Sequence, residues 1–344
     1  MKSRFEPPRL LRGADAQTIF ANLWRPRPGP RMARVRWELG DGDFLDLDRA
    51  AGPDQDAPVA VLCHGLEGSS TAPYLRGLAR ALVSRGLAVV ALNFRTCGGE
   101  TNRLARSYHS GETTDLGEVV RRLLVERPGR PVVVAGFSLG GNVVTKWLGE
   151  HGDGLPPEVR GGAAVSVPFD LAACQRRIDG PGRIMWIYRE RFMRRLRRKA
   201  AVKARRFPGL FDAAAVARAT TFGEYDQLFT APVHGFASRD DYYARSSAGR
   251  FVGGIRRPFL AISAADDPMV PADSLPVAEA GANPAVRLVV TSLGGHSGFV
   301  DGSPLRPGFW AERMVADHLA AVARDGGRAP SAMINDWPAR RHRS

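Results

Sequence analysis

Several features of metal, nucleotide, cofactor and membrane proteins are missing from this sequence. Its 344 residues include only three cysteines, Cys63, Cys97 and Cys174. Their spacing fits no metal site, and so sparse and odd a count suits a reducing compartment. Residues 136–141 lack both the lysine of a phosphate-binding loop and the spacing of a dinucleotide fingerprint. No apolar run approaches the ~18 residues of a membrane span, and the first twenty residues lack the apolar segment of a secretion signal. We therefore expect a cytoplasmic protein with no cofactor and no metal ion.

Acidic residues are scarce in one segment. The chain carries a formal net charge of +14, and residues 183–206 contain eleven lysines or arginines but only one acid, Glu190. Apolar side chains recur there every four residues, which predicts an amphipathic helix. Three interpretations remain open: contact with an anionic membrane or an acidic substrate, contact with nucleic acid, and a solvated face whose apolar side packs on the core. No nucleic-acid partner is expected, because no RNA- or DNA-binding motif is present.

The strongest catalytic pattern lies at residues 132–142, VVVAGFSLGGN. A short β-branched run ends in Gly136-Phe137-Ser138-Leu139-Gly140, and a helix-like stretch follows. This is the strand–turn–helix setting of a G-x-S-x-G nucleophile elbow, in which a strained turn exposes the serine hydroxyl. We predict that Ser138 is a nucleophile.

A nucleophilic serine needs a base, and the base needs an acid that orients it. Two later predicted strands, Pro258–Ile262 and Val286–Thr291, are each followed by such a group. His296 follows the second strand and is the predicted general base. Asp266 and Asp267 follow the first strand and compete for the role of acid. Asp267 fits the usual D-x-x-V-P placement, and Asp266 would then brace the loop.

The amides that would stabilise an oxyanion are also predictable. One is the backbone N–H of Leu139, directly after the serine, and the other is that of Leu66, in the His64-Gly65-Leu66 loop after the predicted strand Val59–Cys63. We interpret His64 as structural, because it precedes this turn and comes before the serine in the chain.

Two other histidines are weaker candidates. His109 and Asp115 are similar to a histidine–aspartate acyltransferase signature, but one extra residue separates them, and a predicted helix follows. We interpret this stretch as structural. His234 is interpreted as a packing residue that could reach the pocket.

The chain resembles α/β-hydrolases of the YheT-like group, relatives of the mammalian abhydrolase-domain lipid hydrolases. The resemblance covers residues 15–320 and rests on the triad pattern together with further motifs. These are Gln17-Thr18-Ile19, residues 41–48, His64 to Gly68, Asn93 to Glu100, Tyr108 to Thr113, residues 230–243 and Asp266-Asp267-Pro268. It implies hydrolysis of carboxylic esters, short-chain or lipid-like, through an acyl-enzyme, without fixing the substrate. An acyltransferase with the same triad and a non-catalytic lipid-binding protein are the alternatives.

The order of the predicted elements favours an α/β fold with a mostly parallel sheet covered by helices on both faces. Predicted strands are Leu87–Asn93, Val132–Ala135 and Ala163–Val167, and predicted helices are Pro73–Arg85, Glu112–Glu126 and Asn142–Glu150. Val35–Leu39 and Phe44–Asp48 flank an Asp-Gly turn and predict an antiparallel opening hairpin.

The long interval before the Asp-bearing strand predicts a helical cap over the serine, because no ordinary loop is so long. We expect a hydrolase core at 1–167 and 256–325, a cap at 168–255 and a disordered tail at 326–344. If the basic segment of the cap contacts an anionic membrane, the expected cytoplasmic enzyme is also a peripheral membrane protein.

Overall fold

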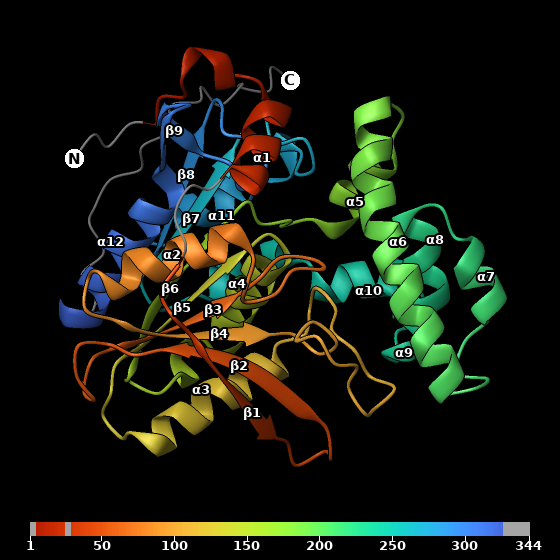
Figure 1. Ribbon diagram of the computed structural model, residues 1–344, viewed down its shortest axis with the longest axis horizontal. Helices are drawn as coiled ribbons and strands as arrows, with labels where there is room; N and C mark the ends of the chain where they lie inside the picture. Colours follow the sequence, from red (N-terminus) through yellow and green to blue (C-terminus); the bar gives the residue numbers. More distant parts are fainter. Residues whose placement is uncertain (1–4, 25–28, 326–344) are drawn as a thin grey trace.

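Short β-branched runs form the strands of a central sheet in the computed structural model, which describes residues 5–24 and 29–325 (Figure 1). The tail predicted to be disordered, 326–344, lies outside the described residues. The strands of the main sheet are β1 (Ala33–Glu38), β2 (Phe44–Ala50), β3 (Val59–Cys63), β4 (Ala88–Asn93), β5 (Val132–Phe137), β6 (Val159–Val165), β7 (Phe259–Ala264) and β8 (Val286–Thr291). A separate hairpin joins β9 (Val300–Ser303) to β10 (Arg306–Phe309).

The main sheet has the order β1-β2-β4-β3-β5-β6-β7-β8 in the part of the chain that is described. The predicted opening hairpin forms as β1 and β2, with Val35 opposite Leu47. β2 also runs antiparallel to β4, and all later neighbours are parallel. The carboxyl ends of β3, β5, β7 and β8 therefore meet at one edge of the sheet.

Helices cover both faces of the sheet, because alternate side chains of each strand point to opposite sides. Val61 of β3 packs in one cluster with α3 and α4, whereas Leu62 packs in another with α2 and α12. The helices along the chain are α1 (Ala14–Leu23), α2 (Pro73–Val83), α3 (Thr114–Glu126), α4 (Leu139–His151), α5 (Leu171–Asp179), α6 (Arg183–Arg206), α7 (Ala213–Arg218), α8 (Phe222–Tyr225), α9 (Ala231–Val233), α10 (Arg239–Ser246), α11 (Val277–Ala282) and α12 (Trp310–Asp325). Short helical turns are η1 (Arg9–Leu11), η2 (Gly152–Gly154), η3 (Asp226–Thr230), η4 (Ala248–Gly254) and η5 (Ala272–Ser274).

Two elements begin three or more residues earlier than predicted, whereas the other predicted bounds differ by two residues or fewer. β6 begins at Val159 rather than Ala163, because Gly161 and Gly162 lie within the strand. A Cβ at Gly161 would lie 2.4 Å from the carbonyl oxygen of Pro258, so this close approach needs glycine. α4 begins at Leu139 rather than Asn142, because Ser138 is already its N-cap.

Helices α5 to α10 lie between β6 and β7 in the chain and to one side of the sheet (Figure 1). They have a small apolar core of their own, which includes Leu196, Phe222 and Phe229. By contrast, Ala248 and Val252 of η4 pack with the core of the sheet. We propose that the cap comprises residues 168–246, slightly less than the predicted 168–255. None of the helices in the described ranges is long and apolar enough to cross a membrane.

Candidate active site

Ser138 stands on a strained turn between β5 and α4. Its backbone has φ +52° and ψ −121°, a conformation that a residue with a side chain rarely adopts. The flanking glycines allow the turn. A Cβ at Gly136 would lie 2.2 Å from the carbonyl oxygen of Gly140, and a Cβ at Gly140 would lie 2.4 Å from that of Cys63. These contacts are the physical reason for both glycines of the predicted elbow.

Ser138, His296 and Asp267 come together at the carboxyl edge of the sheet. The His296 Nε2 atom lies 2.9 Å from the Ser138 Oγ, and the His296 Nδ1 atom lies 2.9 Å from an Asp267 carboxylate oxygen. The Asp267 side chain is almost fully buried, and it accepts hydrogen bonds from the amides of Met269 and Val270. An acid fixed in this way can orient the imidazole so that its other nitrogen can accept a proton from the serine.

Asp266, the competing acid, faces a different group. One of its carboxylate oxygens accepts a hydrogen bond from the Gly295 amide at 2.9 Å. The other has no hydrogen-bond partner among the described residues, and burial raises the pKa of this carboxyl. Asp266 therefore holds the loop that carries His296, while Asp267 contacts the imidazole itself.

Both ring nitrogens of His64 form hydrogen bonds with backbone groups. Its Nδ1 atom lies 2.7 Å from the Gly65 carbonyl oxygen, and its Nε2 atom accepts the amide of Phe94 at 3.2 Å. Burial lowers the pKa of His64 to about 4. A neutral ring that donates at one nitrogen and accepts at the other has no free position for a base. The structural interpretation of His64 agrees with this geometry.

Leu66 and Leu139, whose amides are the predicted oxyanion donors, line the same pocket as Ser138. On either side of Leu66, the Gly65 amide donates to the Tyr74 hydroxyl and the Glu67 amide donates to the Tyr108 hydroxyl. Within residues 5–24 and 29–325, the Leu66 amide itself has no acceptor. Leu139 is the first residue of α4, a position where helical amides lack an intrahelical acceptor. Both groups are available to a developing negative charge.

Sequence reasoning missed the side chains that hold the His296 loop. The Thr18 hydroxyl accepts the amide of His296 at 2.9 Å and donates to the carbonyl oxygen of Ala14. Gln17, fully buried beside it, bonds the backbone of Val300 through both ends of its amide. Both residues belonged to a recognised motif, but nothing in a single sequence links a position near residue 18 to one near residue 296.

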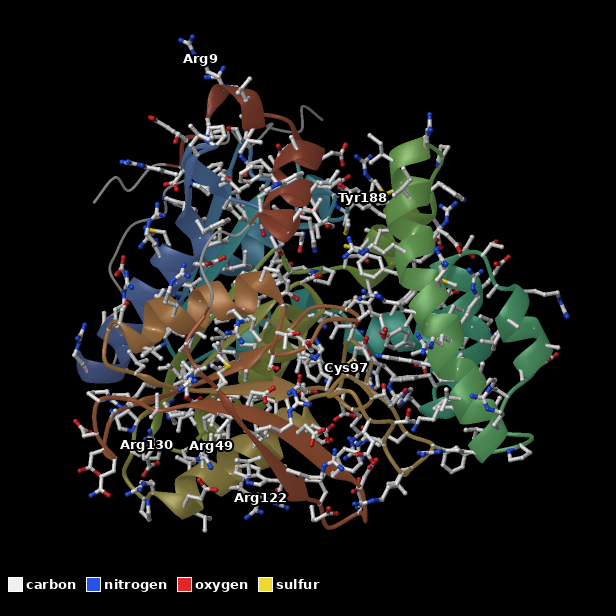
Figure 2. All side chains as sticks on the ribbon, in the orientation of Figure 1. Arg9, Arg49, Cys97, Arg122, Arg130 and Tyr188 are labelled. Carbon is white, nitrogen blue, oxygen red and sulfur yellow. The ribbon has the colours of Figure 1, made fainter. Side chains whose placement is uncertain are left out.

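A second missed network joins the cap to the Leu66 loop. The Glu67 carboxylate accepts hydrogen bonds from the Tyr108 hydroxyl at 2.7 Å and from the Lys199 ammonium of α6 at 2.8 Å. Arg195, one turn earlier on α6, donates to the Glu67 carbonyl oxygen at 3.1 Å. Figure 2 shows Cys97, which lies 3.2 Å from the same ammonium, on the loop that faces α6. Arg195 and Lys199 of the cap thus both donate hydrogen bonds to Glu67, the residue that follows Leu66.

Six of the eleven basic residues of α6 bind groups of the fold, which the sequence could not indicate. Besides Arg195 and Lys199, these are Arg189, Arg197, Lys203 and Arg206. Lys203 is buried and donates to backbone carbonyl oxygens of the loop before α3, and burial lowers its pKa to about 8. Five arginines, at 183, 191, 194, 198 and 205, have no partner within the described part of the chain. Their spacings of three, four, seven and eight residues place them on one face of the helix.

His109 and His234 lie together, away from the triad. Their rings are 4.6 Å apart, and His234 contacts the Ser107 hydroxyl at 3.3 Å. Burial lowers the pKa of His109 to about 4 and that of His234 to about 3. Asp115 instead forms a paired hydrogen bond with the buried Arg95 guanidinium. The stretch from His109 to Asp115 therefore contains no His–Asp pair.

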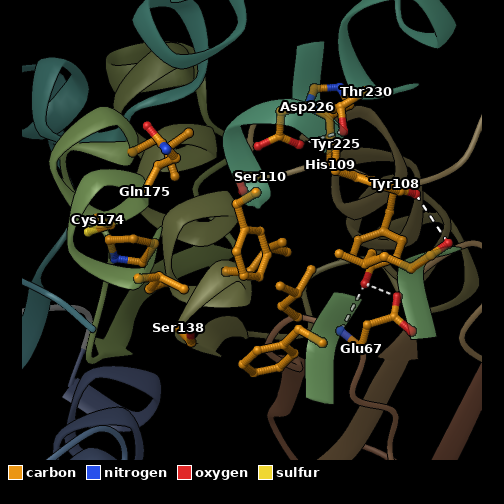
Figure 3. A pocket seen from close by; sticks show the side chains of 18 of the residues that line it. Glu67, Tyr108, His109, Ser110, Ser138, Cys174, Gln175, Tyr225, Asp226 and Thr230 are labelled. Atoms are coloured by element: carbon orange, nitrogen blue, oxygen red, sulfur yellow. Dashed lines mark hydrogen bonds between the residues drawn. The ribbon is translucent and has the colours of Figure 1, made fainter. Parts of the chain in front are cut away.

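A mostly apolar pocket runs from Ser138 under the cap. Leu171, Phe222, Phe229 and Val270 are among the residues that line it. Figure 3 shows Ser138 at one side, with His109, Asp226 and Thr230 on the far side. The Asp226 carboxyl accepts hydrogen bonds from the Thr230 hydroxyl and from that of Tyr243, and burial raises its pKa to about 6. The pocket offers a mostly apolar lining next to the serine, with polar groups around Asp226 and around Glu67.

Comparisons with known proteins agree with this architecture. A family model described as the alpha/beta hydrolase fold matches residues 58–303. The candidate esterase YheT of Escherichia coli K12 is 37% identical over 92% of this chain and 93% of its own length. Phospholipase ABHD3 of Mus musculus is 30% identical over 90% of this chain and 76% of its own length. The solved structure of the esterase Pf2001 of Pyrococcus furiosus is similar with a TM-score of 0.55 and 18% identity, covering 92% of this chain and 97% of that one.

Proposed function

Because the chain belongs to the α/β-hydrolase family, within its YheT-like group, we propose that it is a serine hydrolase that cleaves carboxylic esters. The observation that carries this proposal is the unbroken chain of contacts from the Ser138 hydroxyl through the His296 ring to the Asp267 carboxylate. The apolar pocket beside Ser138 supports an acyl chain as one part of the substrate. Relatives named as an esterase and a phospholipase support the same class of reaction.

The proposed reaction follows from the roles of the three side chains. His296 takes the proton of Ser138 as the hydroxyl oxygen attacks the ester carbonyl, and Asp267 stabilises the imidazolium that forms. The amides of Leu66 and Leu139 bind the oxyanion, where losing one such donor typically costs about 3 kcal/mol. His296 then protonates the leaving alcohol. A water molecule repeats the attack on the acyl-enzyme and releases the acid.

The test compares serine variants. Ser138→Ala should abolish both the hydrolysis of p-nitrophenyl esters and labelling by a fluorophosphonate probe, while thermal unfolding stays cooperative. Ser69→Ala, which removes a hydroxyl from the neighbouring loop, is the matched control and should keep both signals. Labelling that persists in Ser138→Ala would show that another residue is the nucleophile.

The same triad could transfer the acyl group to an alcohol instead of water. Adding glycerol or ethanol to the assay separates the two reactions, since a transferase would form a new ester at the expense of free acid. A non-catalytic lipid-binding role would leave the fluorophosphonate signal absent from the unchanged protein. The intact triad geometry favours hydrolysis over this last alternative.

Peripheral contact with an anionic membrane is the second part of the proposal. Ile184, Trp186 and Ile187 at the start of α6 are each about half exposed, and the unpartnered arginines at 183, 194 and 205 accompany them on this helix. Exposed apolar side chains beside cations suit an interface with acidic lipids. Figure 2 shows Tyr188 on the side that faces α1, where its hydroxyl bonds Asp15. Ile184 lies one turn before Tyr188 on the same side, whereas Trp186 and Ile187 lie on other sides of α6.

Vesicle pelleting tests this contact. The protein should sediment with phosphatidylserine vesicles at low salt and be released at high salt, because screening weakens attraction between exposed charges. Trp186→Ser should weaken sedimentation without changing hydrolysis of water-soluble esters. Equal binding to neutral vesicles at both salt concentrations would exclude an electrostatic contribution.

A further inference from the structure

Ser138 and His296 lie where two cavities of different chemistry meet. The first is the apolar pocket under the cap. The second is a groove between α6 and the loop that contains Leu66, and Ser138 and His296 line it as well. An ester consists of an acyl part and an alcohol part, which lie on either side of the reacting bond. Two cavities that meet at one nucleophile therefore suggest that each part binds in its own cavity. This reasoning rests on the proposed esterase function.

The loop that carries His296 indicates which part of the ester, acyl or alcohol, enters the groove. His296 lines both cavities, but Ser297, the next residue, and Thr18, which holds their loop, line only the groove. The base must protonate the leaving alcohol, so the alcohol lies on the histidine side of the serine. The apolar pocket then receives the acyl chain, and the groove receives the alcohol.

The groove carries uncompensated positive charge. Arg191, Arg195, Arg198 and Lys199, all on α6, line it, together with two acids, Glu67 and Glu100. Both acids are already paired, Glu67 with Lys199 and Glu100 with Arg36. Arg195 donates to a neutral carbonyl oxygen, so its charge is not cancelled. Arg191 and Arg198 have no partner in the described part of the molecule.

The two unpartnered guanidinium groups stand on one side of the helix. Arg191 and Arg198 are seven residues apart, which is about two turns, with Arg195 between them. Guanidinium groups in such an array bind the oxygens of phosphate or carboxylate through paired hydrogen bonds. A neutral alcohol would form no ion pair with these guanidinium groups.

We propose that the substrate is an ester whose alcohol part carries an anionic group, of phosphate type, bound in the groove by Arg191 and Arg198. The acyl chain occupies the apolar pocket, and the anion lies along α6. The bond that breaks is the ester bond to the alcohol oxygen, and the anionic group leaves unchanged with that alcohol. Such an alcohol occurs in acyl glycerophosphates of membranes and in soluble phosphorylated esters.

A matched pair of substrates tests the proposal in the full-length protein. Octanoyl glycerol and octanoyl glycerol 3-phosphate share the acyl chain and the glycerol, and differ only by the phosphate. Used as monomers below their aggregation thresholds, they should differ in kcat/KM by at least about tenfold in favour of the phosphate, mainly through KM. Adding the phosphate substrate within neutral vesicles then separates a lipid source from a soluble one, according to which form is cleaved faster.

Variants on one helix provide the control. Arg191→Gln with Arg198→Gln should reduce the preference for phosphate to near unity. Arg194→Gln with Arg205→Gln removes the same charge from the same helix outside the groove lining. On the monomeric substrates, where no membrane takes part, this variant should keep the preference. Equal rates on the two substrates, or a preference that survives in the Arg191 and Arg198 variant, would overturn the proposal while leaving the esterase function intact. If neither substrate nor any p-nitrophenyl ester is cleaved and no fluorophosphonate label forms, the proposed function fails instead.

Discussion

The two adjacent aspartates allow a sharp test, because the structure gives them different partners one residue apart. Asp267 lies 2.9 Å from His296 Nδ1, and only 1% of its side chain and 13% of that of His296 are exposed. When the imidazole gains a proton, two opposite charges face each other with their centres about 3–4 Å apart. At an effective dielectric of about 20, their attraction is about 4–6 kcal/mol. Asp267→Asn removes this attraction and favours the wrong imidazole tautomer.

The expected result is a fall in kcat of about 10³–10⁴ for Asp267→Asn on a p-nitrophenyl ester, since each 1.36 kcal/mol is about a tenfold change in rate. Asp266→Asn is the control. It keeps an oxygen for the Gly295 amide and neutralises a carboxyl that burial already disfavours as an anion, so its kcat should stay within about tenfold of the parent enzyme. Circular dichroism should show both variants folded. A larger loss in Asp266→Asn than in Asp267→Asn would refute the assignment.

Gly140→Ala should destabilise the fold by at least about 3 kcal/mol in urea titrations, because the added Cβ would meet two backbone oxygens. Gly281→Ala in α11 is the control, since its Cβ would enter open space, and it should be neutral or stabilising. Thr18→Val should lower kcat about tenfold by leaving the His296 amide unpaired, and Thr18→Ser should restore it; an unchanged rate in Thr18→Val would contradict the role of this hydroxyl. Burial raises the pKa of Asp226 to about 6 in the fold, so its ionisation costs stability as pH rises from about 4 to about 6, and the loss levels off above that. Between pH 4 and pH 8, Asp226→Asn should therefore gain up to about 3 kcal/mol in unfolding free energy relative to the parent, and parallel pH profiles would exclude the effect.

The fold was predictable because its signals are local. Val286–Thr291 and Val59–Cys63 are short apolar runs with β-branched residues, and both form strands with the predicted bounds. The 24-residue helix α6 also has the predicted bounds, since its apolar side chains follow the helical period. The prediction failed at Gly161 and Gly162, where glycine lies within a strand for reasons of packing. The three-dimensional contacts of Gly161 with Pro258 and of Gly162 with Leu148 and Val134 explain that choice.

The candidate site was predictable where residues follow strand ends in a fixed order, as Ser138, Asp267 and His296 do. It was not predictable where support comes from remote segments. The Thr18 hydroxyl reaches a residue 278 positions away, and Lys199 reaches Glu67 across 132 positions. The basic composition of α6 was plain from the sequence. Among the described residues, six of its cations bind the fold and five have no partner, and this division depends on which face of the helix meets the core.

The hydrogen bond from Thr18 to the His296 loop also bears on how much of the chain makes up a working unit. The matched family segment begins at residue 58, after α1, β1 and β2. A protein trimmed to that segment would retain Ser138, Asp267 and His296, the three side chains of the proposed triad. It would nevertheless lose the hydrogen bond between the Thr18 hydroxyl and the His296 amide. The edge of β4 that pairs with β2 would also be exposed and could pair with a strand of another chain. Engineering of this protein should therefore keep α1, β1 and β2 as part of the scaffold of its candidate site.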